Sequence, residues 1–146
     1  MELELKYYAA YLPYDIKVYN IGTKKIEKIY ELKKYVNPKN EELFYIVTNS
    51  GHYSSLYQQL ILRPLSDLTN EIEIGGKKFI PIDELNKIHP DYKIFIEDDE
   101  CYIKDLCNMN MTHICTNLEF YDKLLSWHFD LFGLIENNLA IDINTI

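Results

Sequence analysis

The sequence is poor in arginine and has no long apolar run. Arg63 is the single arginine among 15 basic residues, and 23 acidic residues give a formal net charge of −8. Affinity for a nucleic-acid backbone comes mainly from Lys and Arg that displace counterions, so we expect no autonomous nucleic-acid binding. A bilayer crossing needs roughly 20 apolar residues, and a secretion signal needs a basic region followed by an apolar run. The chain shows neither, so we expect a cytoplasmic protein with no membrane partner.

Cysteine is also scarce. The three cysteines, Cys101, Cys107 and Cys115, form an odd set without a secretion signal, which favours reduced thiols over disulfides. With His113 they are the only cluster of soft metal ligands in the sequence. Zinc sites usually bring ligands in close pairs separated by roughly two to four residues, and this cluster has no such pair of cysteines. We therefore expect no metal and no cofactor.

Motifs for nucleotide binding and serine chemistry are absent as well. Residues 75–78 (GGKK) lack the GxxxxGK[ST] spacing that wraps a phosphate, and residues 52–55 (HYSS) lack the GxSxG turn. His128 and Asp130 resemble a histidine oriented by a carboxylate. Successive side chains on a helix point about 100° apart, so these two are not expected to face each other. We predict no catalytic residue and a protein that is not an enzyme.

What the sequence does have is the composition of one folded domain. Its 146 residues are 47% hydrophobic and 26% charged, and a chain of this length can bury roughly 70% of its unfolded surface. No repeat or linker divides it, so we predict a single domain over residues 1–146. Tyrosine is abundant, and the group near the N-terminus is read either as ordinary packing or as a partner-binding patch. This group consists of Tyr7, Tyr8, Tyr11 and Tyr14.

Alternation of apolar residues predicts strands. Residues 16–21 and 25–36 are rich in Ile, Val and Tyr, and Gly22 allows a tight turn between them, which indicates an antiparallel hairpin. Residues 1–12 are expected to form a short amphipathic turn or strand. Further strands are expected at residues 43–48, 78–82, 93–96, 101–104 and 139–143.

Helical periodicity is clearest near the C-terminus. Thr116 and Glu119 match a capping box before residues 117–132, the longest periodic segment. Shorter helices are expected at residues 66–73 and 84–88. The apolar stripe of the long helix consists of Phe120, Leu124, Trp127 and Leu131. The predicted fold class is therefore α+β, with a small antiparallel sheet (the N-terminal hairpin plus later strands) packed against a long C-terminal helix and one or two short helices.

Two charged stretches are candidate surfaces. Residues 97–100 are four consecutive acids between two expected strands, and four adjacent charges are expected to remain exposed. Because acids attract a basic surface, such as the groove in which a nucleic-acid enzyme holds its substrate, we predict partner binding here. The predicted binding residues are Glu97, Asp98, Asp99 and Glu100. The second stretch is expected to be a solvated hairpin face, with contact to RNA left open, and contains Lys24, Lys25, Lys28, Lys33, Lys34 and Lys39.

Two segments, taken together and in this order, resemble a group of small, mostly uncharacterised proteins from bacteriophages and prophages of Bacteroides-like bacteria. They are residues 60–85 (LILRPLSDLTNEIEIGGKKFIPIDEL) and residues 123–146 (KLLSWHFDLFGLIENNLAIDINTI), about a third of the chain. The N-terminal hairpin and the cysteine region do not share the resemblance. It implies a phage origin and the host bacterial cytoplasm. Since some small acidic phage proteins block RNA-guided nucleases, it suggests inhibition of the anti-CRISPR type, but it carries over no functional residue.

Three functional hypotheses follow, from different classes. The leading one is a non-enzymatic phage accessory protein that binds and inhibits a host defence effector, such as an RNA-guided (CRISPR) nuclease complex. Its partner would be a host protein or ribonucleoprotein with a basic surface. The alternative is a homo-oligomeric structural or assembly accessory protein, and the third is a small metal-dependent enzyme that uses the Cys/His cluster. The partner's identity, the step inhibited and the oligomeric state stay open.

Overall fold

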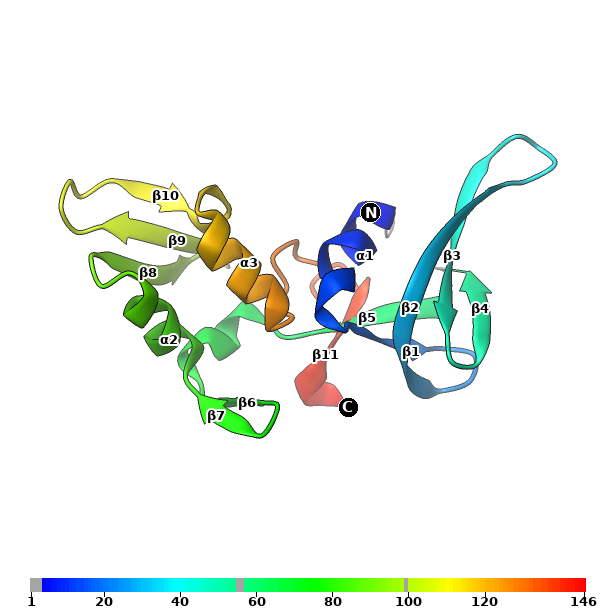
Figure 1. Cartoon of the computed structure of the whole chain (residues 1–146), viewed down its shortest axis with the longest axis horizontal. Helices are drawn as coiled ribbons and strands as arrows, with labels where there is room; N and C mark the ends of the chain where they lie inside the picture. The colour runs from blue at the N-terminus through cyan, green and yellow to red at the C-terminus, as the bar shows by residue number, and fades with distance from the viewer. Residues whose placement is uncertain (1–3, 55–56, 99) are drawn as a thin grey trace. The chain divides into compact units, whose positions relative to one another are not determined.

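The computed structural model describes residues 4–54, 57–98 and 100–146, and the chain divides into two compact units (Figure 1). Unit 1 consists of Met1–Leu62 with Phe132–Ile146, and unit 2 consists of Arg63–Leu131. The α+β class is confirmed, because the described residues form a mixed six-stranded sheet, two small sheets and α-helices of at most nine residues. None of these helices has the length and apolarity that a membrane crossing requires. The single domain over residues 1–146 stays a prediction.

Unit 1 is built on the six-stranded sheet, in the order β11-β5-β1-β2-β3-β4. Its strands are β1 (Lys17–Asn20), β2 (Lys25–Val36), β3 (Glu42–Thr48), β4 (Gly51–Ser54), β5 (Gln58–Leu62) and β11 (Ala140–Asp142). The predicted hairpin is confirmed as β1 and β2, which pair from Lys17 opposite Lys28 to Asn20 opposite Lys25. The predicted all-antiparallel sheet is wrong, since β11 pairs in parallel with β5. That pairing joins segments from distant parts of the sequence, and no local pattern signals it.

Helix α1 (Leu5–Tyr11) replaces the turn or strand that we expected at the N-terminus. Tyr8 and Tyr11 are fully buried on it, and the ring of Tyr8 packs edge-on against Phe44 of β3 with centroids 5.6 Å apart. The Tyr8 hydroxyl donates a hydrogen bond to the backbone carbonyl of Gln58 at 2.9 Å. Tyr11 packs on Phe132 at 5.9 Å. These two tyrosines therefore belong to the core of unit 1.

Unit 2 combines a three-stranded sheet, a small hairpin and two helices. The sheet has the order β10-β9-β8, and β6 pairs with β7. The elements are β6 (Ile72–Ile74), β7 (Lys77–Phe79), α2 (Pro81–Ile88), β8 (Tyr92–Glu97), β9 (Glu100–Asp105), β10 (Met111–His113) and α3 (Leu118–Ser126). Ile94 and Ile103 on the inner face of the sheet share a hydrophobic cluster with Leu85 of α2 and Phe120 of α3. The two helices therefore cover one face of this sheet.

The long C-terminal helix that the sequence predicted is wrong. Helix α3 has nine residues and ends at Ser126, and His128 adopts a left-handed conformation with φ 63°. Beyond the helix, backbone groups pair with Arg63 instead: the Arg63 N–H donates to the His128 carbonyl and the Asp130 N–H donates to the Arg63 carbonyl, both at 2.8 Å. Tertiary backbone pairing thus overrides helical periodicity after Ser126. The stripe still forms core, because Phe120, Leu124 and Trp127 are buried.

Two other helix predictions need correction. Residues 66–73, expected to be helical, form a short 3₁₀ helix at Leu65–Thr69 and then strand β6. Thr116 is not the N-cap of α3, because the side chain of Asn117 accepts the hydrogen bond from the backbone N–H of Phe120 at 3.2 Å. The predicted helix at 84–88 is confirmed but begins earlier, at Pro81, where a missing backbone donor is harmless in the first turn.

Candidate partner-binding surface

The strands β8, β9 and β10 turn one face of their sheet away from the helices. Side chains alternate between the two faces of a strand, so the neighbours of the buried Ile94 and Ile103 point outward. We call this the outer face. Strand register arranges it in three rows: Lys93 and Lys104 with Met111, then Phe95 and Tyr102 with His113, then Glu97 and Glu100.

An aromatic row occupies the middle of the outer face. The rings of Phe95 and Tyr102 stack with centroids 5.8 Å apart and planes inclined by 22°, and His113 meets Tyr102 edge-on at 5.6 Å. His113 Nδ1 accepts a hydrogen bond from the backbone N–H of Cys115 at 3.2 Å, which fixes the orientation of the ring. All three rings are half-buried, so each keeps some surface available for contact. Alternation in residues 93–96 is the local signal for this row, but only the pairing of β8, β9 and β10 brings its three rings together.

The predicted acidic residues lie at one end of this row. Glu97 and Glu100 are opposite each other across the hairpin, and Asp98 follows in the turn; all three are exposed. Asp99 lies outside the described residues. The Tyr102 hydroxyl donates a hydrogen bond to Glu100 Oε2 at 2.7 Å. That bond, with the nearby charges of Glu100 and Glu97, raises the pKa of the Tyr102 phenol and keeps it a neutral donor.

The outer face carries two like-charge pairs across strands. Lys93 is opposite Lys104 in one outer row, and Glu97 is opposite Glu100 in the other. Like charges directly opposite each other destabilise a sheet, whereas opposite charges stabilise it. These two pairs do not stabilise the sheet, and a partner with complementary charges would offset the repulsion within each pair. Two charged rows of opposite sign around an aromatic row therefore have the chemistry of a contact surface.

The Cys/His cluster is not assembled into one site. Cys101 is buried on the inner face, where burial raises the pKa of its thiol to about 12, while Cys107 and Cys115 are exposed. His113 belongs to the outer face, on the other side of the sheet from Cys101. Within the described ranges, no three residues among His, Cys, Asp and Glu lie close enough to hold a metal ion.

The remaining candidates are placed separately. Gly75 and Gly76 form the turn between β6 and β7, both with positive φ. Asp130 is buried and His128 is half-buried, in the irregular segment after α3. The lysines of the predicted hairpin face all lie on β2 or in the turns at its ends, and Lys28 forms an ion pair with Asp15 at 2.6 Å.

Comparison with known proteins adds no family. No family model, no curated protein and no solved structure matches the chain.

Proposed function

We propose that the protein is a non-enzymatic binding protein whose outer face docks on a basic surface of a partner protein or ribonucleoprotein. The observation that carries this proposal is the exposed Glu97 and Glu100 pair beside the stacked rings of Phe95 and Tyr102. Acids at the edge of an aromatic patch attract a basic partner over a long range, while the aromatic rings provide a centre that loses its water when the partner binds. The net charge of −8 acts in the same direction.

The two rows would contribute differently to binding. The acids would mainly raise the association rate, because complementary charge steers diffusional encounter and is screened by salt. The aromatic rings would mainly slow dissociation, because they bury large rigid areas with little loss of side-chain entropy. Binding should therefore weaken as salt is added but should not vanish.

The resemblance to phage proteins supports a partner class. Under that resemblance the partner is a host defence effector, and an RNA-guided nuclease complex fits the requirement for a basic surface, since such a complex holds nucleic acid in a positively charged channel. Affinity capture from a bacterial host, with and without nuclease treatment, identifies the partner and separates protein contacts from RNA-bridged ones. Capture that survives nuclease treatment is the expected result.

Two sets of substitutions test whether these particular acids, and not the net negative charge of the protein, drive binding. Changing Glu97, Asp98, Asp99 and Glu100 to Ser should leave the fold intact and weaken binding to the captured partner by tenfold or more at low salt, with a smaller salt dependence. The matched control changes four exposed acids elsewhere to Ser, namely Glu42, Glu71, Glu73 and Asp91. Equal losses in both variants, or an affinity that does not change with ionic strength, would contradict the proposal.

A second candidate function is self-assembly, and one feature of unit 1 favours it. Strand β1 pairs with β2 only from Lys25 to Lys28, and β2 continues with β3 as a long two-stranded arm (Figure 1). Tyr35, Val36 and Leu43 on this arm are exposed. An exposed strand edge with apolar side chains can pair with another chain. Sedimentation velocity distinguishes the two functions: a stable closed oligomer favours assembly, and a monomer at high concentration excludes it.

A further inference from the structure

The charges on the outer face of unit 2 are arranged symmetrically about its aromatic row. Lys93 and Lys104 lie in the row at one end of the strands, and Glu97 and Glu100 lie in the row at the other end. On both β8 and β9 the aromatic row lies midway, two residues from each charged row. A strand rises about 3.3 Å per residue, so the two charged rows are about 13 Å apart. The face therefore carries opposite charges at equal distances on either side of its middle.

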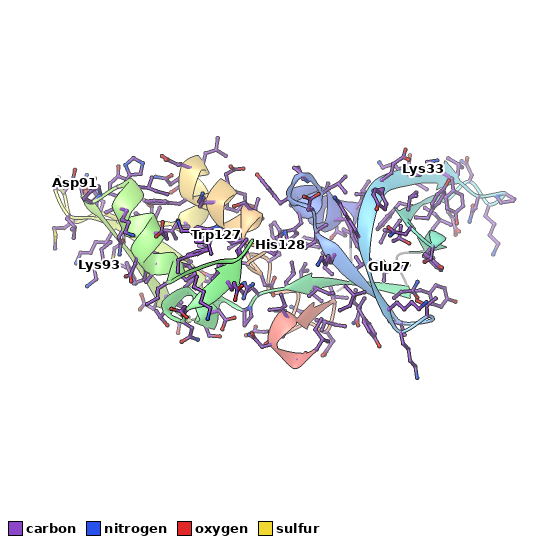
Figure 2. The ribbon with its side chains drawn as sticks, turned by 60° about the horizontal axis from the view of Figure 1, so that its bottom comes forward. Glu27, Lys33, Asp91, Lys93, Trp127 and His128 are labelled. Atoms are coloured by element: carbon purple, nitrogen blue, oxygen red, sulfur yellow. The ribbon has the colours of Figure 1, made fainter. Side chains whose placement is uncertain are left out.

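The charged side chains of the outer face are free of ion pairs in the part of the chain that the structure describes. These side chains are Lys93, Lys104, Glu97 and Glu100. A separation of about 13 Å exceeds the screening length of about 8 Å at physiological ionic strength, so the two rows do not neutralise each other. Lys93 lies at the periphery of unit 2, whereas Trp127 lies in its hydrophobic cluster (Figure 2). These charges are therefore available to another molecule.

A twofold axis along the aromatic row would bring each charged row onto its opposite in a second copy. Such an axis runs across the strands, turns one outer face toward the other and reverses the strand direction. On β8, Lys93 would lie over Glu97 of the second copy, and on β9, Lys104 would lie over Glu100, because each pair is centred on the aromatic row. Sheets that pack face to face keep their strands within about 30° of each other, and this axis allows that geometry.

This arrangement would also offset the repulsion within each like-charge pair. Each pair of lysines meets a pair of glutamates, and opposite charges across an interface attract. The aromatic rings and Met111, which is 50% exposed in the lysine row, supply apolar contact. A face built on three short strands is smaller than the roughly 800 Å² that each partner buries in a stable interface. A dimer of this kind is therefore transient and depends on protein concentration.

We propose that the outer face binds the outer face of a second copy of this chain, in a transient twofold-symmetric dimer. A basic partner is complementary only to the acidic row, whereas a second copy is complementary to both charged rows. The dimer therefore does not depend on the proposed function, although both concern the same face. Where a basic partner also binds, the second copy competes with it, and the apparent affinity for the partner falls as protein concentration rises.

Two charge-reversed variants test the dimer by sedimentation equilibrium. One carries Lys93→Glu with Lys104→Glu, and the other carries Glu97→Lys with Glu100→Lys. Each variant alone places like charges across the interface, so its self-association should be at least tenfold weaker than that of the parent protein. In an equal mixture, the two variants restore opposite charges at every contact and should associate at least as strongly as the parent protein.

The matched control changes two lysines of unit 2 that lie outside this face. Lys77→Glu with Lys78→Glu alters the net charge by the same amount at exposed positions of β7, and it should self-associate like the parent protein. Circular dichroism checks that each variant is folded. Carbodiimide coupling of the parent protein needs no variant, because it joins a lysine amine directly to a carboxylate in contact with it. In a mixture of isotope-labelled and unlabelled protein, we expect cross-links of mixed isotope between Lys93 and Glu97.

Three results would overturn the proposal. They are a parent protein that stays monomeric at low salt and high concentration, a mixture that associates no better than its separate variants, and self-association that persists in both separate variants. The last result would assign self-association to another surface, such as the strand edge of unit 1. A parent protein that dimerises without binding a captured partner contradicts only the proposed function, and a strict monomer that binds the partner contradicts only the dimer.

Discussion

Trp127, directly after α3, packs against side chains of β7 and α3 in unit 2. It is 7% exposed, its ring lies 5.0 Å from that of Phe79, and the Lys123 ammonium lies 5.4 Å above it. Removing a buried Trp side chain typically costs about 3–5 kcal/mol. We therefore expect Trp127→Ala to lower the free energy of unfolding by about that amount in denaturant titration. Leu118→Ala is the control, because Leu118 at the start of α3 is 79% exposed and should change stability by less than about 0.5 kcal/mol. Unchanged stability of Trp127→Ala would make its ring a binding surface instead.

The three thiols should differ in reactivity. Burial raises the pKa of Cys101 to about 12, and the thiolate is the reactive form, so Cys101 should resist a thiol reagent at pH 8. Cys107 and Cys115 are exposed and should react in the native protein. Reagent titration should therefore count two thiols before denaturation and three after it. A third rapid thiol in the native state would contradict the buried position.

The same pKa shift has a consequence for stability. The pKa of Cys101 in the folded protein lies above the ordinary thiol value of about 8.5, so the stability that the buried neutral thiol contributes is fully present below that pH. This stability is lost as pH rises from there toward 12, because the Cys101 thiol ionises readily only in the unfolded chain. Cys101→Ala should accordingly flatten the decline in melting temperature above pH 9, compared with the parent protein.

At the scale of elements, the start of α3 shows which neighbour caps the helix. Asn117 accepts the Phe120 N–H at 3.2 Å, while the Thr116 hydroxyl donates to the His113 carbonyl at 2.8 Å. Asn117→Ala should therefore cost about 1 kcal/mol of stability, the usual value for a lost N-cap. Thr116→Ala should cost less than about 0.5 kcal/mol, since its exposed bond has water as a substitute. The reverse order in thermal or chemical unfolding would restore the capping box that the sequence predicted.

At the scale of the whole molecule, unit 2 is one continuous segment with its own hydrophobic cluster. We expect a fragment of residues 63–131 to fold alone, with cooperative unfolding and a near-ultraviolet signal from Trp127. Its stability should be low, because a domain of this size buries only about 60% of its unfolded surface. A fragment that stays unfolded would support the single domain that composition predicts.

Several features of this protein could be predicted from local sequence. The turn over residues 21–24 and the β-branched residues around it favour the β1–β2 hairpin, although the positive φ in this turn is at Lys24 and not at Gly22. Strands β8 and β9 follow from alternation that matches their burial. The exposure of Glu97, Asp98 and Glu100 also followed, because adjacent charges cannot all be desolvated. These properties depend on neighbours within a few residues, which is the range that sequence patterns report.

Tertiary structure decided the rest. Helix α3 ends early because Arg63 offers backbone partners to His128 and Asp130, more than sixty residues along the chain. His113 joins Phe95 and Tyr102 only through the pairing of β10 with β9. Glu27 meets Thr48 and Ser50 because β2 and β3 pair in one particular register. Each of these contacts depends on pairing between strands or backbone segments that are far apart in the sequence. Several segments share a similar local pattern, so the pattern alone does not select the pairing partner. Local sequence therefore determined which segments form strands and helices, and tertiary packing determined which of those segments pair.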